Sequence, residues 1–312
     1  MAKRRTCFIL PSSAEIDLPT PLAVVCHDAG AANLIISWLR DYPGLPRACM
    51  EGPARILWEN AFPETGTFPL NEVLNNSASL LSGTGWASDL EHEARRLART
   101  KGIRIIAALD HWTNFRERFV RGGELILPDE LWVADTEAEA EARRCFPALP
   151  IRQRPNLYLE KLARDVAAHG PTPARSEPHN VLYVLEPVRQ DWGCGGEPGE
   201  YQALAFFLES LPALGIDEHV KIRLRPHPSD PPGKYDNWPL RYPRLDLAVE
   251  DDGSLAEQIA WADWVVGCET FALVIALQAG RIAVSSLPPW AQPCRLPQRE
   301  LVHLRNLLPS QA

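Results

Sequence analysis

Residues 264–286, WVVGCETFALVIALQAGRIAVSS, hold an apolar run, a short polar turn, a fully apolar segment and a second apolar run. This order predicts a strand, a turn, a helix and a strand. The segment FALVIALQA is apolar on every side, which is typical of a buried helix, and Gly280 is a natural stop for it. Glu269 and Thr270 fall where the helix begins. The unpaired N–H groups of a helix start suit an anion such as a phosphate.

A second signal lies upstream, in the segment KIRLRPHP at residues 221–228. It predicts a strand whose outward side chains are Lys221, Arg223 and Arg225. The strand ends at a His–Pro pair, His227 and Pro228. Arginine binds phosphate through two N–H groups at once, and a fixed imidazole can donate to a phosphate oxygen. The alternative is an edge strand whose arginines lie in water, with the histidine packed in a turn. Because charges in a buried parallel strand need partners, the pattern favours phosphate binding.

The composition indicates a soluble globular protein without a general affinity for nucleic acid. Of 312 residues, 46% are hydrophobic and 23% are charged, and the formal net charge is −8. An acidic chain lacks the basic face that nucleic-acid binding usually needs. Apolar runs are too short for a transmembrane segment or a signal peptide, so we expect a cytoplasmic protein. Peripheral attachment to the inner membrane face through a partner stays open.

Seven cysteines are scattered along the chain without a CxxC pair. The odd number and the spacing argue against a disulfide framework and a structural zinc site, so we expect no bound metal. Most of the cysteines are expected to be buried as small apolar residues.

Strands alternate with helices in both halves of the chain. The clearest early unit is LAVVCHDAGAANLIISWLRD, residues 22–41, and a later helix has a candidate capping box in Ser88 and Glu91. The alternation restarts after a Pro-rich connection, and such alternation predicts doubly wound parallel sheets. We therefore expect an α/β fold of two Rossmann-like domains, residues 1–165 and 178–312, that face each other across a cleft.

Polar residues follow the expected strands of the first half. Ligands bind at the carboxyl ends of strands in open parallel sheets, so these residues are site candidates. Three of them can act as the base that takes a proton from an acceptor: His27, Asp28 and Asp110. The alternative for each aspartate is a turn in which its carboxylate bonds its own backbone. The remaining candidates are expected to bind the acceptor, and they are Gly83, Thr84, Gly85, Trp86, His111 and Asn114. Trp86 is expected to stack on a sugar ring.

Polar residues also follow the expected strands of the second half, and we expect them to bind the donor. They are Glu186, Arg223, Arg225, His227, Pro228, Glu269 and Thr270. Thr270 is suited to meet a phosphate, whereas Glu269 is expected to accept hydroxyl groups of a ribose or sugar, since an acid repels a phosphate. The alternative for this pair is a helix cap without a ligand. The loop at 191–196 is expected to be mobile and able to close over a donor.

The paired α/β halves resemble a GT-B glycosyltransferase. RLRPHP followed by VVGCETFALVIALQAG is similar to the donor domain of bacterial surface-carbohydrate enzymes. These include the CMP-sialic acid and CMP-Kdo transferases and the CDP-glycerol glycerophosphotransferases. The resemblance implies that His227 contacts donor phosphate and that Thr270 stands in the later Ser/Thr motif, where Glu269 replaces a second hydroxyl. UDP-GlcNAc 2-epimerases are similar in having two such α/β halves. In this chain, however, CET at 268–270 stands in place of their Gly-rich donor signature.

This resemblance implies a metal-independent glycosyltransferase of bacterial surface-polysaccharide synthesis. The donor would be a CMP-, CDP- or UDP-linked sugar, with no other cofactor, and the acceptor a carbohydrate or glycolipid. The alternatives are a UDP-GlcNAc 2-epimerase-like enzyme and a non-catalytic nucleotide- or sugar-binding protein of the same fold.

Overall fold

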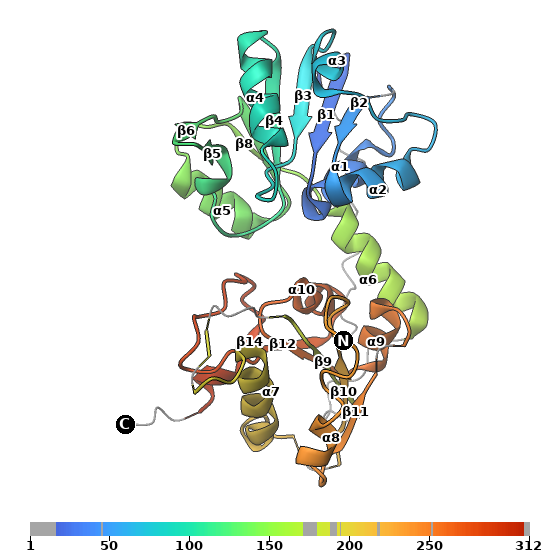
Figure 1. The fold of residues 1–312 in the computed structure, drawn as a ribbon, viewed down its shortest axis with the longest axis vertical. Coiled ribbons are helices and arrows are strands. Elements are labelled where there is room, and N and C mark those ends of the chain that lie inside the picture. Colours follow the sequence, from blue (N-terminus) through green and yellow to red (C-terminus); the bar gives the residue numbers. More distant parts are fainter. Residues whose placement is uncertain are drawn as a thin grey trace, which may run out of the picture. The chain divides into compact units, whose positions relative to one another are not determined.

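The structure, a computed structural model, describes residues 17–44, 46–170, 180–187, 192–193, 195–216, 219–250 and 252–308. The chain divides into two compact units, Met1–Tyr158 (unit 1) and Leu159–Ala312 (unit 2), and each is built around its own sheet. The division falls near the start of helix α6 (Leu157–His169). Figure 1 shows the helices and strands of both units.

Unit 1 contains a six-stranded sheet in the order β2-β1-β3-β4-β7-β8, in which all neighbouring strands are parallel. A short antiparallel pair, β5 with β6, lies outside this sheet. Along the chain the elements are β1 (Leu22–Cys26), α1 (Ala29–Leu39), β2 (Arg47–Met50), α2 (Gly52–Ala61), α3 (Leu70–Leu74), β3 (Ser79–Ser82), α4 (Leu90–Thr100), β4 (Arg104–Leu109), β5 (Val120–Arg121), β6 (Glu124–Leu125), β7 (Glu130–Val133), α5 (Thr136–Cys145) and β8 (Ile151–Gln153).

Helices cover both faces of the unit 1 sheet (Figure 1). Successive residues of a strand point to opposite faces, and β1 follows this rule. Val24 packs in one cluster with Trp58 of α2 and residues of α1. Val25 packs in another cluster with Ala94 of α4 and residues of α3. The predicted doubly wound α/β architecture is therefore confirmed in this unit.

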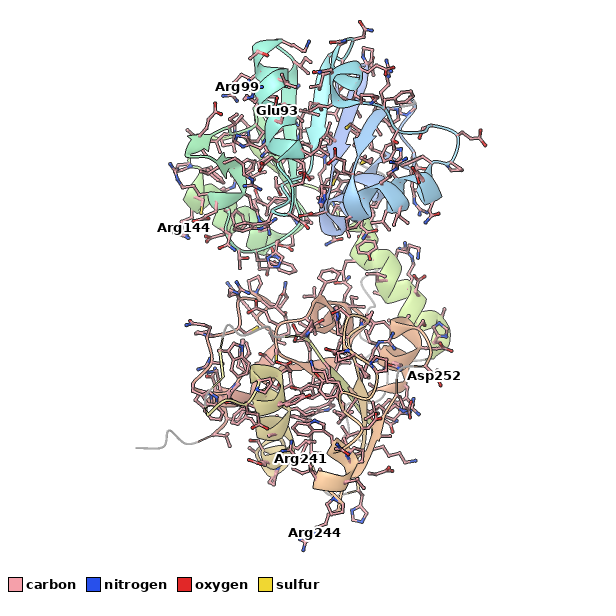
Figure 2. The ribbon with its side chains drawn as sticks, viewed as in Figure 1. Glu93, Arg99, Arg144, Arg241, Arg244 and Asp252 are labelled. Carbon is pink, nitrogen blue, oxygen red and sulfur yellow. The ribbon has the colours of Figure 1, made fainter. Side chains whose placement is uncertain are left out.

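The outer surfaces of the covering helices carry the charges. Arg99 of α4 and Arg144 of α5 project away from the sheet, as does Glu93 (Figure 2). Glu93 pairs with Arg96 one turn along the same helix, at 2.6 Å. Exposed pairs of this kind contribute little to stability, so the buried faces of the helices hold the unit together.

Unit 2 contains a second six-stranded parallel sheet, in the order β11-β10-β9-β12-β13-β14. Counted from the first strand of the unit, this is the order 3-2-1-4-5-6 of the dinucleotide-binding Rossmann fold. The elements are β9 (Asn180–Val184), α7 (Gly199–Glu209), β10 (Lys221–Arg225), α8 (Trp238–Arg241), β11 (Asp246–Val249), α9 (Leu255–Trp261), β12 (Trp264–Gly267), α10 (Phe271–Gln278), β13 (Ile282–Ser285) and β14 (Val302–His303).

Two predictions for unit 2 have clear outcomes. Helix α10 is buried from Ala272 to Ala276, and Gly280 follows it with a φ of 75°, the left-handed conformation of a helix stop. Strand β10 pairs with β9 on one side and β11 on the other. The alternative of an edge strand for KIRLR is therefore wrong.

Each sheet has one place where the strand order reverses direction. In unit 1 it lies between β1 and β3, and in unit 2 between β9 and β12. In open α/β sheets, ligands bind outside the carboxyl ends of the strands at this switch point. Among the described residues, no helix combines the length and the apolar character needed to cross a bilayer.

The burial of α10 gives a stability prediction. Leu273 is fully buried, so Leu273→Ala should lower the free energy of unfolding of unit 2 by about 3 kcal/mol through lost contacts and a cavity. Leu240 is 78% exposed, and Leu240→Ala should change it by less than about 0.5 kcal/mol. Denaturant unfolding measures both variants, and equal losses would contradict the burial of α10.

Candidate functional site

Three neighbouring strands of unit 2 bring the predicted donor residues to one edge. Strand β9 lies between β10 and β12, with Arg225 opposite Val184. Glu186 follows β9, His227 follows β10, and the 268–270 turn follows β12. The structure therefore places these predicted residues at adjacent strand ends, as the sequence led us to expect.

The carboxylate of Glu186 is hydrogen-bonded to the backbone N–H groups that precede α10. Its Oε2 accepts hydrogen bonds from the backbone N–H of Cys268 at 2.7 Å and of Glu269 at 2.8 Å. Burial raises the pKa of the Glu186 carboxyl to about 7, although these N–H groups oppose the shift. A carboxylate of the protein thus lies where the sequence suggested a phosphate.

The two other predicted residues of this turn have partners as well. The Thr270 hydroxyl accepts from the backbone N–H of Ala272 at 3.2 Å, so Thr270 is the N-cap of α10. Glu269 binds Arg295 twice: Oε1 accepts from Nε and Oε2 from the backbone N–H, both at 2.7 Å. Sequence reasoning missed Arg295, because it lies in a Pro-rich segment with no periodic pattern.

The His–Pro turn after β10 holds an exposed imidazole in a fixed orientation. The Nδ1 of His227 accepts from the backbone N–H of Ser229 at 3.1 Å, and it also meets the Ser229 hydroxyl at 2.8 Å. Because Nδ1 accepts a hydrogen bond, the neutral ring carries its proton on Nε2, which can donate to a ligand. Pro228 is exposed in the same turn.

A half-buried lysine, Lys234, supports this turn. The backbone N–H of His227 donates to Asp230 Oδ2 at 3.0 Å. The other oxygen of Asp230 accepts from Lys234 Nζ at 2.7 Å, and Lys234 also donates to Glu200 at 2.9 Å. The side chains of Asp230 and Lys234 are 3% and 15% exposed, so this chain of contacts links the turn to the core.

The two arginines of β10 have different surroundings. Arg223 pairs with Glu250 at 3.1 Å, and its guanidinium lies 3.7 Å from the centre of the Trp261 ring. These contacts give Arg223 a structural role. Arg225 is half-buried at the end of the strand, and one of its nitrogens donates to the carbonyl of Gly253 at 3.1 Å.

Three neighbouring strands of unit 1 bring the predicted catalytic residues together in the same way. Asp28 follows β1, Trp86 lies beyond β3, and Asp110 follows β4. Asp28 Oδ1 meets His27 Nδ1 at 2.8 Å, and its Oδ2 accepts from the backbone N–H of Trp86 at 3.1 Å. The side chains of His27, Asp28 and Asp110 are 18%, 28% and 16% exposed, so a ligand can reach them.

Arg118 contacts Asp110 and lies near Asp28, and sequence reasoning missed it. It is 5% exposed and contacts Asp110 Oδ1 at 3.4 Å. Burial lowers the pKa of the Arg118 guanidinium, and the carboxylates of Asp110 and Asp28 oppose this shift. Both carboxylates therefore lie within electrostatic reach of one buried cation.

The loop after β3 is held by arginines rather than presented to a ligand. The carbonyls of Gly83, Thr84 and Gly85 accept from Arg95, Arg118 and Arg121 respectively. All three loop residues are buried, and the Thr84 hydroxyl donates to the carbonyl of Ala108 at 3.2 Å. The next residue, Trp86, is 47% exposed, with the Arg118 guanidinium 5.7 Å from its ring centre.

The residues after Asp110 form a tight turn. The Nδ1 of His111 accepts from the backbone N–H of Trp112 at 3.0 Å and meets the Thr113 hydroxyl at 3.1 Å. Asn114 is exposed, with a positive φ of 58°. Its backbone conformation is therefore that of a turn residue.

Glu91 differs from its predicted role. The N-cap of α4 is Asp89, so the expected capping box of Ser88 and Glu91 is wrong. Glu91 is 1% exposed and accepts from the backbone N–H of His27 at 2.8 Å. Burial raises the pKa of its carboxyl. Glu91 thus fixes the backbone that carries His27 and Asp28.

Two further points complete the site. Of the loop at 191–196 that was expected to close over a donor, residues 191 and 194 lie outside the described residues. Within the described residues, no group of three or more His, Cys, Asp or Glu side chains is arranged to hold a metal ion.

The comparisons with known proteins concern the fold. A scan against protein-family models gives no match, and a search of curated proteins gives none either. Among solved structures, the chain is similar to UDP-GlcNAc 2-epimerase of Neisseria meningitidis bound to UDP-GlcNAc, with a TM-score of 0.55 and 9% identity over 92% of this chain and 89% of that one. This likeness and the two parallel sheets confirm the predicted two-unit α/β fold of GT-B type.

Two other solved structures are similar at lower scores. The wall teichoic acid polymerase TagF has a TM-score of 0.44 and 12% identity, over 88% of this chain and 72% of that one. The GT-B domain of a sialyltransferase from Photobacterium damselae has a TM-score of 0.41 and 12% identity, over 81% and 88%.

The raised pKa of Glu186 gives a prediction for stability against pH. The folded form binds the proton more tightly than the unfolded chain, so the protein should lose stability as the pH rises from about 4.5 to about 7. Glu186→Gln keeps an oxygen for both N–H groups and has no charge. It should be more stable than the parent by about 2 kcal/mol at about pH 8, since partial exposure reduces the full effect.

Thermal and denaturant unfolding across this pH range measure the difference between Glu186→Gln and the parent. The difference should shrink towards about pH 4, where both side chains are neutral. A constant difference at every pH would contradict a raised pKa for Glu186.

Proposed function

We propose that the chain is a glycosyltransferase that moves a sugar from a nucleotide-activated donor to an acceptor hydroxyl. In this proposal unit 2 binds the donor beside β9, β10 and β12, and unit 1 binds the acceptor beside β1, β3 and β4. The observation that carries it is the pair of switch points. Each has charged and proton-accepting side chains at the place where open parallel sheets bind ligands.

Arg225 and the imidazole of His227 are proposed to bind the donor phosphate. His227 offers the N–H at Nε2, because its Nδ1 accepts from Ser229. Arg225 lies at the end of the same strand. A fixed guanidinium and a fixed N–H donor stabilise the charge that develops on a leaving phosphate, so this proposal needs no metal ion.

Glu186 is proposed to bind a hydroxyl of the donor's ribose or sugar. Its Oε2 already fills the N–H groups of Cys268 and Glu269, where a phosphate would otherwise bind. A carboxylate held in this way accepts hydrogen bonds from hydroxyl groups and repels a phosphate. This proposal changes the expected role of Thr270 from a phosphate contact to a helix cap.

Asp110 is proposed as the base, with the His27–Asp28 pair as the second candidate. Both oxygens of Asp28 already have donors, His27 and the N–H of Trp86. Asp110 contacts Arg118, which holds it in place. In the proposed step the acceptor O–H gives its proton to Asp110 and its oxygen bonds to the anomeric carbon. The bond from that carbon to the phosphate oxygen breaks, and its electrons leave with the phosphate.

His227→Ala tests the donor site. Loss of one phosphate donor should lower turnover at least about tenfold, because the lost contact is strongest in the transition state. Transfer from a panel of CMP-, CDP- and UDP-linked sugars measures it, with folding checked by circular dichroism. His169→Ala, an exposed histidine at the end of α6, is the matched control and should keep full turnover. A folded His227→Ala variant within tenfold of the parent would contradict this site.

A second candidate is a UDP-GlcNAc 2-epimerase-like activity, favoured by the fold match to such an enzyme. Incubation with UDP-GlcNAc, followed by proton NMR, separates the candidates. Inversion at carbon 2 of the sugar without an acceptor supports the epimerase. Sugar transfer that depends on an added acceptor supports the transferase. Specific binding without turnover across the panel supports a non-catalytic protein of this fold.

The biological setting follows from the proposed chemistry. Resemblance to surface-carbohydrate enzymes supports a role in bacterial surface-polysaccharide synthesis, with a carbohydrate or glycolipid acceptor. We place the reaction in the cytoplasm, where nucleotide-activated sugars are made, with association at the inner membrane face when the acceptor is a glycolipid.

A further inference from the structure

Each of the three candidate catalytic side chains in unit 1 lies against the backbone of a glycine. The pairs are Asp110 with Gly30, His27 with Gly52, and Asp28 with Gly85. In every pair, an added Cβ on the glycine would meet the ring or carboxylate of its partner. The glycines come from α1, from the start of α2 and from the loop after β3, so three separate segments each leave room for one functional side chain.

Gly30 is explained by Asp110 and not by its own backbone. It lies in the first turn of α1, and its φ is not positive, so the conformation does not require glycine. Glycine is also among the poorest helix formers. A Cβ at this position would overlap Asp110 Oδ2 and lie 3.0 Å from its Cγ. The carboxylate therefore fills the space that any other residue would need.

Gly85 has the same relation to Asp28. Its φ is not positive either, and a Cβ there would overlap Asp28 Oδ2 and lie 3.0 Å from Oδ1. The loop cannot easily move away, because its carbonyls are bonded to arginines, with Gly85 itself accepting from Arg121 at 2.7 Å. The side chain of Asp28 would have to move instead.

Gly52 is a different case. A Cβ there would lie 2.5 Å from His27 Nε2, but its φ of 49° favours glycine for backbone reasons alone. Substitution at Gly52 would combine the clash with His27 and the strain of a positive φ. Gly30 and Gly85 are therefore the positions at which the clash can be tested alone.

We infer that Gly30 and Gly85 are positioning residues, which set where the carboxylates of Asp110 and Asp28 lie. Alanine at either position would turn the carboxylate away without removing it. For Asp110 this means leaving the contact with Arg118 at 3.4 Å. The link to catalysis rests on the proposed function, whereas the contact between glycine and carboxylate does not.

The contact is tested without a substrate, by a double-mutant cycle on stability. In an Asp110→Ala background, Gly30→Ala should raise the ratio of folded to unfolded protein about fivefold, the usual gain for this change in a helix. With Asp110 present, the gain should vanish or reverse. An equal gain in both backgrounds would overturn the inference.

The positioning role is tested by turnover on the full chain. Gly30→Ala should lower kcat to nearly the value of Asp110→Ala, with the KM for the donor unchanged, and should add nothing to Asp110→Ala. Gly170→Ala is the control, because no atom lies within 4 Å of the added Cβ. Coupling in stability with an unchanged kcat would overturn the role in catalysis. An inactive parent that still shows the coupling would reject the proposed function and keep the contact.

Discussion

A carboxylate that bonds to backbone N–H groups across the switch point underlies both candidate sites. In unit 2, Glu186 after β9 accepts from the turn after β12. In unit 1, Asp28 after β1 accepts from Trp86 in the loop after β3. Each bond joins the two strands between which the sheet reverses its order. These bonds fix the turn at 268–270 in unit 2 and the start of the loop at Trp86 in unit 1.

This arrangement has an electrostatic cost that differs between the units. In unit 2 the carboxylate is buried, so the pKa of Glu186 rises although two N–H groups bond to it. In unit 1 the buried cation Arg118 lies within electrostatic reach of Asp28 and Asp110 and offsets part of their charge. In unit 2, Arg225 and the N–H donor of His227 lie one strand away from Glu186.

Local pattern was sufficient to predict the strand ends and the helix that begins after Thr270. The apolar segment of α10 and its end at Gly280 follow from residues within one helix length. The alternation of apolar runs and helical patterns predicted that strands and helices alternate along the chain in both units. The partners of the candidate residues were not predictable in this way. Glu186 bonds to N–H groups 82 and 83 residues away, and Glu91 to one 64 residues away. The local sequence suggested a capping box for Glu91. In the folded chain its carboxylate instead accepts from the backbone N–H of His27.

The most direct test of the account is an NMR titration of the isotope-labelled protein with CMP-, CDP- and UDP-linked sugars. A donor site at this edge predicts that one of these ligands shifts the backbone amide signals of His227, Ser229 and Asp230 together with those of residues 268–270, because both turns lie at the same edge of the unit 2 sheet. Saturable shifts confined to other parts of the chain, or no shift with any of the ligands, would contradict a donor site at this edge.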